Sequence, residues 1–336
     1  MIKALGIMAI LRCVPSAIMA LRRDAPLLPY YHVVSDEELK HIRQLYGCRK
    51  ITDFGKDLDY LLKHFVPISL EDVYGWLHHG KKLPRQCFHL TFDDGFRECY
   101  DIIAPILKRK GIPATFFLCS DLIDNKQLFF RNKVSLLLDE FGNKIGESGE
   151  KLLAEVLTQH GMEFHGVRQS LLAVNHENSS ILDTIAGALE YDFDDYLRNH
   201  KPYLSRAQVE ELAKDGFAIG SHSVDHPLYR DLSLEEQIQQ TKEGMAAIER
   251  LCPVKIRAFA FPHHGNSVTL SFFRATRDTV DIYFGTNRMK KDVVPECLQR
   301  FSLEDNRYSC EEIIKKNILL QGYYQATFRG TVRREP

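Results

Sequence analysis

The spacing of apolar residues changes several times along the chain, and these changes predict strands that alternate with helices. Two nearly continuous apolar runs, residues 27–34 and 87–92, have the length and composition of buried strands. Helical spacing follows Gly95 and ends at Gly111; its apolar residues are Phe96, Tyr100, Ile103 and Leu107. Residues 114–118 are again a predicted strand. A strand, a helix and a strand in this order predict a parallel sheet.

The same order of elements returns in the second half of the chain. Two serines are each followed, three residues later, by a side chain that completes a capping box, and they predict two helix starts. They are Ser205 with Gln208 and Ser233 with Glu236. Strands are predicted at 217–221 and 258–261, with weaker candidates at 283–286 and 297–301. The fold class is therefore α/β, and its strand ends carry the titratable residues, as in α/β active sites.

Between residues 121 and 204 the strand signal lapses and helical patterns replace it. We interpret this segment as a mostly helical insertion beside the mouth of the main domain. The predicted organisation has three parts: an N-terminal amphipathic helix over residues 1–26, a main domain over 27–310 that the insertion at 121–204 interrupts, and a C-terminal tail over 311–336.

The bulk composition argues against some classes of function. The formal net charge is −1 and no basic run is present, so we expect no nucleic-acid partner. The eight cysteines form no C-x-x-C pair, and several lie in apolar runs. This favours buried, reduced thiols in a cytoplasmic protein. No uncharged apolar run is long enough to predict a transmembrane helix.

Residues 1–23 combine four cations and no acid with many apolar side chains. Such a segment is typical of an amphipathic helix that lies on an anionic membrane, here the inner face. The alternative is an ordinary helix that packs on the domain. Arg12 interrupts the apolar run, which argues against a signal peptide.

Two short motifs carry the candidate chemistry. Asp93 and Asp94 lie at the end of one predicted strand, before Gly95. His222 and His226 lie four residues apart, just after another. One carboxylate and two imidazoles can bind a divalent metal, and the donor types favour Zn²⁺ over other first-row ions. The second carboxylate is left as a base for metal-assisted hydrolysis. The alternatives are an N-capping aspartate and a pair of exposed loop histidines.

Three further candidates also follow predicted strands. In the segment 261–265 (Phe-Pro-His-His-Gly), His263 or His264 can lie beside the metal, or the segment is a rigid turn with incidental histidines. Arg300 can orient a buried carboxylate or form an exposed salt bridge. His32 ends the first strand, and either faces the same site or is a hydrogen-bonded core histidine.

These motifs resemble those of the polysaccharide deacetylases, carbohydrate esterase family 4. Residues 91–95, 222–227 and 261–265 resemble the family's first, second and third motifs, and residues 28–32 resemble the start of many members. The resemblance covers about residues 27–120 and 205–301. It implies a distorted, incomplete (β/α) barrel and metal-dependent removal of N- or O-acetyl groups from sugars.

By position, Asp93 resembles the family's catalytic base, and Asp94, His222 and His226 resemble its metal ligands. The resemblance therefore implies a divalent cofactor, with Zn²⁺ favoured, and an acetylated carbohydrate substrate. Combined with an interfacial N-terminal helix, it suggests a lipid-linked sugar in surface-glycan assembly. Two other functions stay open: a metal-dependent amidohydrolase that acts on a non-sugar amide, and a glycan-binding pseudoenzyme.

The sequence departs from the family pattern at two places. His263 stands where an aromatic or polar residue is usual. The family's later Leu-x-His element, which supplies the general acid, is not recognisable near Leu298. The general acid is therefore open between His32, His263 and His264.

Overall fold

A computed structural model describes residues 25–144 and 147–336, and its centre is one sheet of eight strands. In pairing order these are β10 (Cys297–Gln299), β8 (Ile282–Gly285), β7 (Ala258–Ala260), β6 (Ala218–Ser221), β5 (Ala114–Leu118), β4 (Leu90–Phe92), β1 (Pro29–Tyr31) and β11 (Phe301–Ser302). Every pair is parallel. Strands β4, β5, β7 and β8 are buried along their whole length, which explains their nearly continuous apolar sequences.

One short stretch of chain brings the two ends of this sheet together. Only Arg300 separates β10 from β11, yet these strands lie at opposite ends of the pairing order. The Arg300 backbone N–H donates to the Gly285 carbonyl of β8 (2.9 Å), and the Phe301 N–H donates to the Leu28 carbonyl before β1 (3.1 Å). The sheet thus curls into a nearly closed barrel. The predicted (β/α) barrel is confirmed, and the candidate strand at 297–301 proves to be two strands.

The predicted strand at 87–92 is also divided. Its first part, β3 (Cys87–Phe88), pairs with β2 (Val66–Pro67) in a small separate sheet, and its second part is β4. His89 is the one residue between β3 and β4, and its ring nitrogens lie 2.8 Å from the Ile68 carbonyl and 2.8 Å from the Thr115 hydroxyl. A further small sheet pairs β9 (Lys291–Asp292) with β12 (Thr331–Val332).

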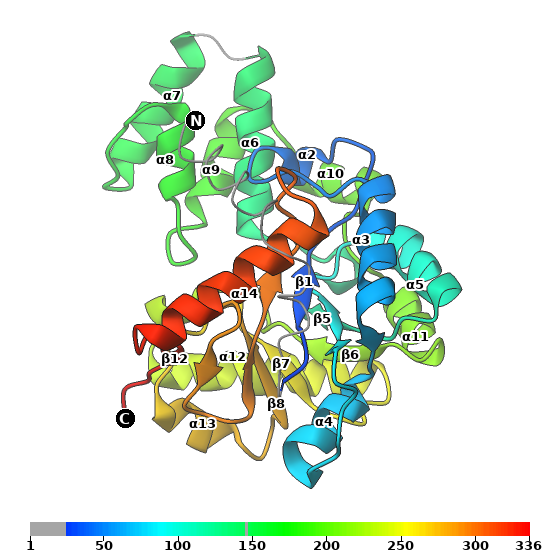
Figure 1. Cartoon of the computed structure of the whole chain (residues 1–336). Helices are drawn as coiled ribbons and strands as arrows, with labels where there is room; N and C mark the ends of the chain where they lie inside the picture. Colours follow the sequence, from blue (N-terminus) through cyan, green and yellow to red (C-terminus); the bar gives the residue numbers. More distant parts are fainter. Residues whose placement is uncertain (1–24, 145–146) are drawn as a thin grey trace.

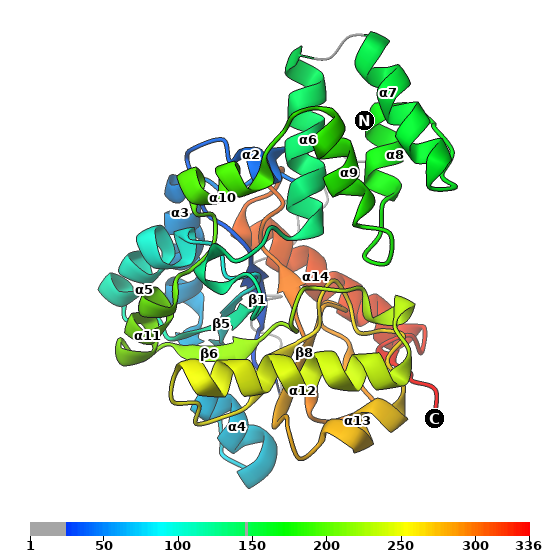
Figure 2. The same ribbon diagram turned by 180° about the vertical axis from the view of Figure 1, so that it is seen from behind.

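Helices cover the outside of the barrel (Figures 1 and 2). They are α3 (Ile51–His64), α4 (Leu70–His79), α5 (Ala104–Lys110), α11 (Arg206–Lys214), α12 (Leu234–Leu251), α13 (Leu270–Thr276) and α14 (Cys310–Ala326), with a π-helical turn at Cys99–Ile103 and 3₁₀ turns at Ile123–Asn125 and Tyr229–Asp231. The capping boxes predicted at Ser205 and Ser233 are confirmed, because each serine exchanges hydrogen bonds with the residue three positions later.

The segment 121–204 forms a helical layer over one end of the barrel, at the top of both Figures 1 and 2. Its helices are α6 (Phe130–Lys144), α7 (Glu147–Gln159), α8 (Val167–Ala173), α9 (Ile181–Ala188) and α10 (Phe193–His200). They share a buried apolar cluster that also includes residues of the main domain such as Val33 and Phe96, and α6 packs against α2 (Lys40–Arg43), which follows β1. No described residue of this segment joins the eight-stranded sheet.

The C-terminal residues belong to the same folded unit as the barrel. Helix α14 begins at Cys310, buries Ile313, Ile314 and Ile318, and packs against α3. Residues 311–336, predicted as a C-terminal tail, therefore include most of a helix and the strand β12. Apolar residues lie on every side of α14, so its sequence shows no clear amphipathic stripe.

Within residues 25–144 and 147–336, no helix is long and apolar enough to cross a membrane. The seven cysteines of these ranges are free thiols, and six of them are buried. The predicted amphipathic helix at the N-terminus falls almost wholly on residues 1–24, outside the described part of the chain.

Candidate active site

The candidate residues gather at the carboxyl ends of the barrel strands. Asp93 and Asp94 follow β4, His222 follows β6, and His32 follows β1. Because the strands are parallel, these ends meet at one mouth of the barrel. The helical insertion begins after β5 and therefore lies at the same mouth (Figure 1).

Two adjacent aspartates face different partners because the chain turns at this point. Asp94 (φ 73°) and Gly95 (φ 74°) both have left-handed backbone conformations, which aspartate tolerates better than most residues. A Cβ on Gly95 would lie 3.0 Å from the Leu118 side chain, so glycine also leaves room for β5. As a result Asp93 contacts Arg300, and Asp94 contacts two histidines.

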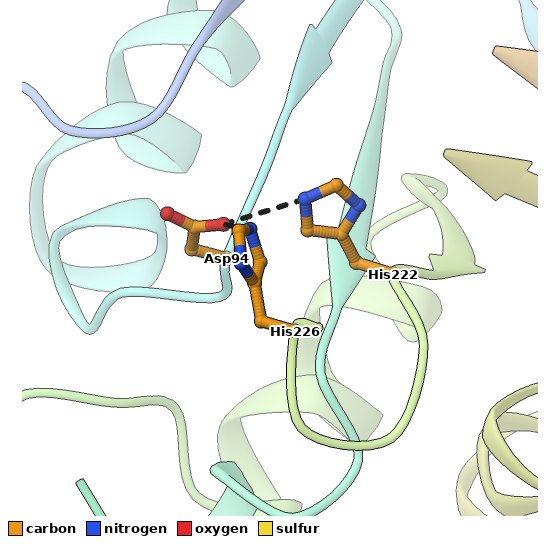
Figure 3. Close-up of side chains that lie close together, drawn as sticks. All are labelled: Asp94, His222 and His226. Carbon is orange, nitrogen blue, oxygen red and sulfur yellow. Dashed lines mark ion pairs between the residues drawn. The ribbon is translucent and has the colours of Figure 1, made fainter. Parts of the chain in front are cut away.

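Asp94, His222 and His226 converge on one point, as Figure 3 shows. Asp94 Oδ1 lies 3.4 Å from Nε2 of His222 and 3.2 Å from Nε2 of His226. The three possible ligand atoms lie within 4.8 Å of one another, and all three residues are buried. Two ligand atoms at about 2.0–2.1 Å from one ion in tetrahedral geometry are themselves about 3.3–3.4 Å apart. The spacing therefore fits a small divalent ion.

The protonation states of these side chains also suit a cation. His222 Nδ1 lies 2.8 Å from the Ala260 carbonyl oxygen. A carbonyl oxygen only accepts, so Nδ1 carries a hydrogen, and Nε2, which faces Asp94, is the nitrogen that can bind a cation. Burial lowers the pKa of His226, which keeps that ring neutral.

The Asp94 carboxyl is ionised, and its Oδ1 has no hydrogen-bond donor among the described residues. Burial alone would raise its pKa, but the imidazoles of His226 and His222 outweigh burial and hold the pKa well below its ordinary range. Oδ1 is buried, and no described residue donates a hydrogen bond of good geometry to it. A buried anionic oxygen left in this way is expected where a cation is the missing partner.

Asp93 is held by a buried arginine. Arg300 Nη1 and Nη2 lie 2.7 and 2.8 Å from Oδ1 and Oδ2 of Asp93, and Nη1 also donates to the Thr91 hydroxyl at 2.9 Å. The guanidinium lies over the rings of Tyr30 (4.9 Å) and Phe117 (5.3 Å). Burial would raise the pKa of Asp93, but Arg300 outweighs burial and lowers it. Arg300 thus orients a buried, ionised carboxylate, and the alternative of an exposed salt bridge is wrong.

His32 lies beside this pair and has a carboxylate partner of its own. In the sheet Tyr31 pairs with Phe92, so His32 and Asp93 are the next residues of two neighbouring strands. His32 Nδ1 lies 2.6 Å from Glu304 Oε2, and the His32 backbone N–H donates to Glu304 Oε1 at 2.6 Å. Burial alone would lower the pKa of His32, but Glu304 outweighs burial and raises it to about 10. The ring is therefore an imidazolium at neutral pH.

The two histidines after β7 differ from His32. The exposed His263 has a left-handed backbone (φ 55°), and its ring packs edge-on against His226 at 4.6 Å. His264 is half-buried. In the described ranges neither ring pairs with a carboxylate. The structure therefore brings His263 beside His226, one of the candidate metal ligands, and pairs neither His263 nor His264 with a carboxylate of the described residues.

Three contributors to the site do not stand out in the sequence. Glu304, which pairs with His32, lies two residues after β11, and a carboxylate just after a strand is the signal that could have found it. Thr91 contacts Arg300 from within β4. Phe129 of the helical insertion packs against His226, with ring centroids 4.5 Å apart, and no local pattern identifies it.

Fold and site together define a (β/α)-barrel protein in which an ionised carboxylate lies beside a buried Asp-His-His cluster. The sequence profile of the polysaccharide deacetylases matches residues 80–275. The chain therefore belongs to the polysaccharide deacetylase family and is a deacetylase, a hydrolase. No curated protein matches it in sequence.

Solved structures of similar fold have low sequence identity to the chain. A deacetylase of Streptococcus pyogenes, PplD, in complex with acetate has a TM-score of 0.55 at 14% identity, over 88% of this chain and 96% of that one. IcaB from Ammonifex degensii has a TM-score of 0.54 at 16% identity, over 88% and 98%. A de-N-acetylase from Aggregatibacter actinomycetemcomitans has a TM-score of 0.54 at 14% identity, over 87% and 98%. These likenesses show a shared fold.

Proposed function

We propose that the protein removes acetyl groups from an acetylated carbohydrate, in a hydrolysis that depends on a divalent ion held by Asp94, His222 and His226. The observation that carries the proposal is the position of the Arg300-bound Asp93 directly beside this cluster. Zn²⁺ is the ion that the nitrogen and oxygen donors and their spacing favour. Such an ion supplies Lewis acidity, which activates water and polarises the acetyl carbonyl.

Asp93 acts as the general base. Its carboxylate is ionised, and Arg300 holds both of its oxygens in one orientation. It accepts a proton from the attacking water, and Arg300 limits the motion of the carboxylate while it does so. Arg300 is a positioning residue in this scheme, because it contacts Asp93 and Thr91 at the buried end of the site.

His32 acts as the general acid. Three histidines compete for this role, and only His32 has a carboxylate partner, Glu304, among the described residues. The pairing keeps the imidazole protonated, so it can give a proton to the leaving group. His263 and His264 lack such a partner, and we assign them to the walls of the substrate site.

An N-acetyl group is the favoured target for this arrangement, with the sugar amine as the leaving group. An amine leaves poorly unless it is protonated, so an acid held in the protonated state contributes more to amide cleavage than to ester cleavage. One protein of similar fold is a de-N-acetylase, and another was solved with acetate. We therefore propose an N-acetylated sugar as the substrate.

We further propose that the enzyme acts on the cytoplasmic side of the membrane, on lipid-linked sugars during surface-glycan assembly. Two observations support this location. The described cysteines are free thiols and mostly buried, as in proteins of a reducing compartment. Residues 1–23 carry four cations and no acid among apolar side chains, a composition suited to an anionic membrane surface.

The proposal is tested by incubating the full chain with Zn²⁺ and three substrates: an N-acetylglucosamine oligosaccharide, an O-acetylated oligosaccharide and a non-sugar acetamide. Release of acetate is measured, with the chelator-treated protein as control. We expect release from the N-acetylated sugar that disappears with the metal. Release only from the acetamide would indicate a non-sugar amidohydrolase, and sugar binding without turnover would indicate a pseudoenzyme.

A further inference from the structure

The loop that carries the two metal-ligand histidines has an unfavourable backbone conformation. We call residues 222–226 the metal loop. Ser223 (φ 73°) and His226 (φ 65°) are both left-handed, which costs free energy for residues other than glycine. Such a conformation persists only when surrounding contacts impose it. The contacts of the metal loop therefore determine where the His226 ring lies.

The junction between the barrel and the insertion, at Asp121, and the barrel helix α12 both hold the metal loop. After β5, the backbone N–H of Asp121 donates to the Val224 carbonyl at 3.0 Å. From α12, the Gln240 side chain accepts from the Val224 N–H at 3.0 Å and donates to the Asp225 carboxylate at 2.9 Å. The loop also braces itself, because the His226 N–H donates to the Ser223 hydroxyl at 3.0 Å.

The third support comes from the helical insertion. His176, in the connection between α8 and α9, places Nε2 2.9 Å from the second carboxylate oxygen of Asp225. Phe129, at the start of the same insertion, packs on the His226 ring. Asp225 is thus bonded on one oxygen to the barrel helix α12 and on the other to the insertion. It directly precedes His226 in the chain.

From these contacts we propose that His176 is a positioning residue through which the helical insertion holds the metal loop in its ligand-binding conformation. The inference rests on the proposed function, because it concerns the ion held by Asp94, His222 and His226. Without His176, one oxygen of Asp225 loses its partner, and the strained loop keeps only its contacts with Asp121, Gln240 and Phe129. The loop then samples other conformations, and the ion binds more weakly.

Loss of an isolated ion pair on the surface would not weaken metal binding in this way. The His176 and Asp225 side chains are 29% and 30% exposed. Partly exposed ion pairs usually contribute little to the free energy of unfolding. Asp225 differs from a residue in such a pair because it belongs to the metal loop. The Gln240 side chain bonds both its carboxylate and the Val224 backbone N–H. The expected effect is therefore on metal affinity rather than on overall stability.

The test compares Zn²⁺ affinity, measured by competition with a chromophoric chelator, in the full chain and three variants. His176→Ala should weaken binding about tenfold, the lower end of the effect seen for residues that support metal ligands. His176→Gln should recover most of the affinity, because its amide N–H can still donate to Asp225. His165→Ala is the matched control: this insertion histidine contacts Glu163 instead and should bind Zn²⁺ as the full chain does.

A second measurement separates positioning from a loss of folding. The visible absorption of bound Co²⁺ reports the geometry of its ligands, and we expect it to change in His176→Ala while the thermal unfolding midpoint of the metal-free protein stays that of the full chain. Zn²⁺ affinity within twofold of the full chain, with an unchanged Co²⁺ spectrum, would overturn the inference. If the unaltered chain binds no Zn²⁺, the proposed function fails and this inference fails with it.

Discussion

At the scale of single residues, the site depends on two adjacent carboxylates that are kept ionised by different neighbours. A bidentate guanidinium compensates Asp93, whereas Oδ1 of Asp94 faces Nε2 of His222 and of His226, the two atoms that can hold a cation together with it. Two buried negative charges so close together would otherwise repel, and one would take up a proton. The separate partners allow one carboxylate to bind a cation while its neighbour accepts protons.

Loss of one ligand should release the metal. His222→Ala removes one of only three candidate ligands, so we expect the metal content of the purified protein to fall sharply, as measured by elemental analysis. His165→Ala, which alters an exposed histidine in the insertion, should leave the metal content unchanged. Equal metal content in both variants would exclude the Asp94–His222–His226 site.

Loss of the base should separate turnover from metal binding. Asp93→Asn keeps the shape of the side chain but cannot accept the proton, so we expect turnover to fall by about 10²–10⁴-fold while the metal is retained. The variant should also be less stable, because Arg300 is fully buried and loses the negative charge of its partner. A loss of turnover below about tenfold, with the metal retained, would remove Asp93 from this role.

The pairing of His32 with Glu304 predicts a pH dependence. Glu304 raises the pKa of His32 to about 10 against the effect of burial, so the general acid is lost, and activity falls, as the pH rises through about 10. In Glu304→Gln burial prevails, and the alkaline limb of the pH–activity profile should move to lower pH. An alkaline limb at the same pH in both proteins would contradict the assignment of His32.

The His32–Glu304 pairing also makes the stability of the fold decrease as the pH rises. Because the folded pKa of His32 lies above its unfolded value, the pairing stabilises the fold fully below about pH 6.5. This contribution is lost as the pH rises through about 10. The unfolding midpoint of Glu304→Gln should therefore lie below that of the unaltered chain at pH 6 and approach it above pH 10.

At the scale of elements, the metal loop depends on close packing of α12. A Cβ on Gly244 of that helix would lie 2.7 Å from the Ser221 hydroxyl and 2.9 Å from the Ser223 backbone. The closest approach of α12 to the end of β6 and to the metal loop is therefore possible only without a side chain at this position.

Two glycine-to-alanine substitutions in helices should have opposite effects. Gly244→Ala overpacks the contact with the metal loop, and we expect it to destabilise the protein by about 1–3 kcal/mol and to weaken metal binding. Gly322→Ala in α14 meets nothing within 4 Å, and the better helix propensity of alanine should stabilise the protein by about 0.5–1 kcal/mol. Urea denaturation measures both, and equal effects would contradict the close packing at Gly244.

At the scale of the whole molecule, the helical insertion lies over the barrel mouth that carries the site. The insertion covers the mouth end of the barrel and contributes Phe129 and His176 to the surroundings of the metal loop. The exposed His263 lies beside His226 at this end of the barrel.

Residues 1–23 should attach the protein weakly to anionic membranes. Each cation near the surface contributes about 1 kcal/mol, so the four cations give reversible, salt-sensitive binding. Sedimentation with phosphatidylglycerol vesicles should show binding that falls with added salt and disappears when residues 1–23 are deleted. If the full chain ignores these vesicles at low salt, the proposal of a lipid-linked substrate loses its main support.

The sequence by itself determined the features that are local along the chain. Apolar periodicity and capping boxes predicted the alternation of strands and helices, and hence a parallel α/β sheet, because each signal spans fewer than about 20 residues. The barrel itself was implied by the resemblance of the short motifs to those of the polysaccharide deacetylases. The aspartate pair and the two histidines were found for the same reason: each motif is short and follows a strand. The sequence did not predict helix α14, because its apolar residues do not form one stripe.

Only the tertiary structure decided which distant residues share a site. Arg300 meets Asp93 across 207 positions of the chain, Glu304 meets His32 across 272, and His176 meets Asp225 across 49. These contacts depend on strand order, on the closure of the barrel at Arg300 and on the docking of the insertion. Periodicity describes how one segment buries its own apolar face, and it contains no information on which segments will lie side by side.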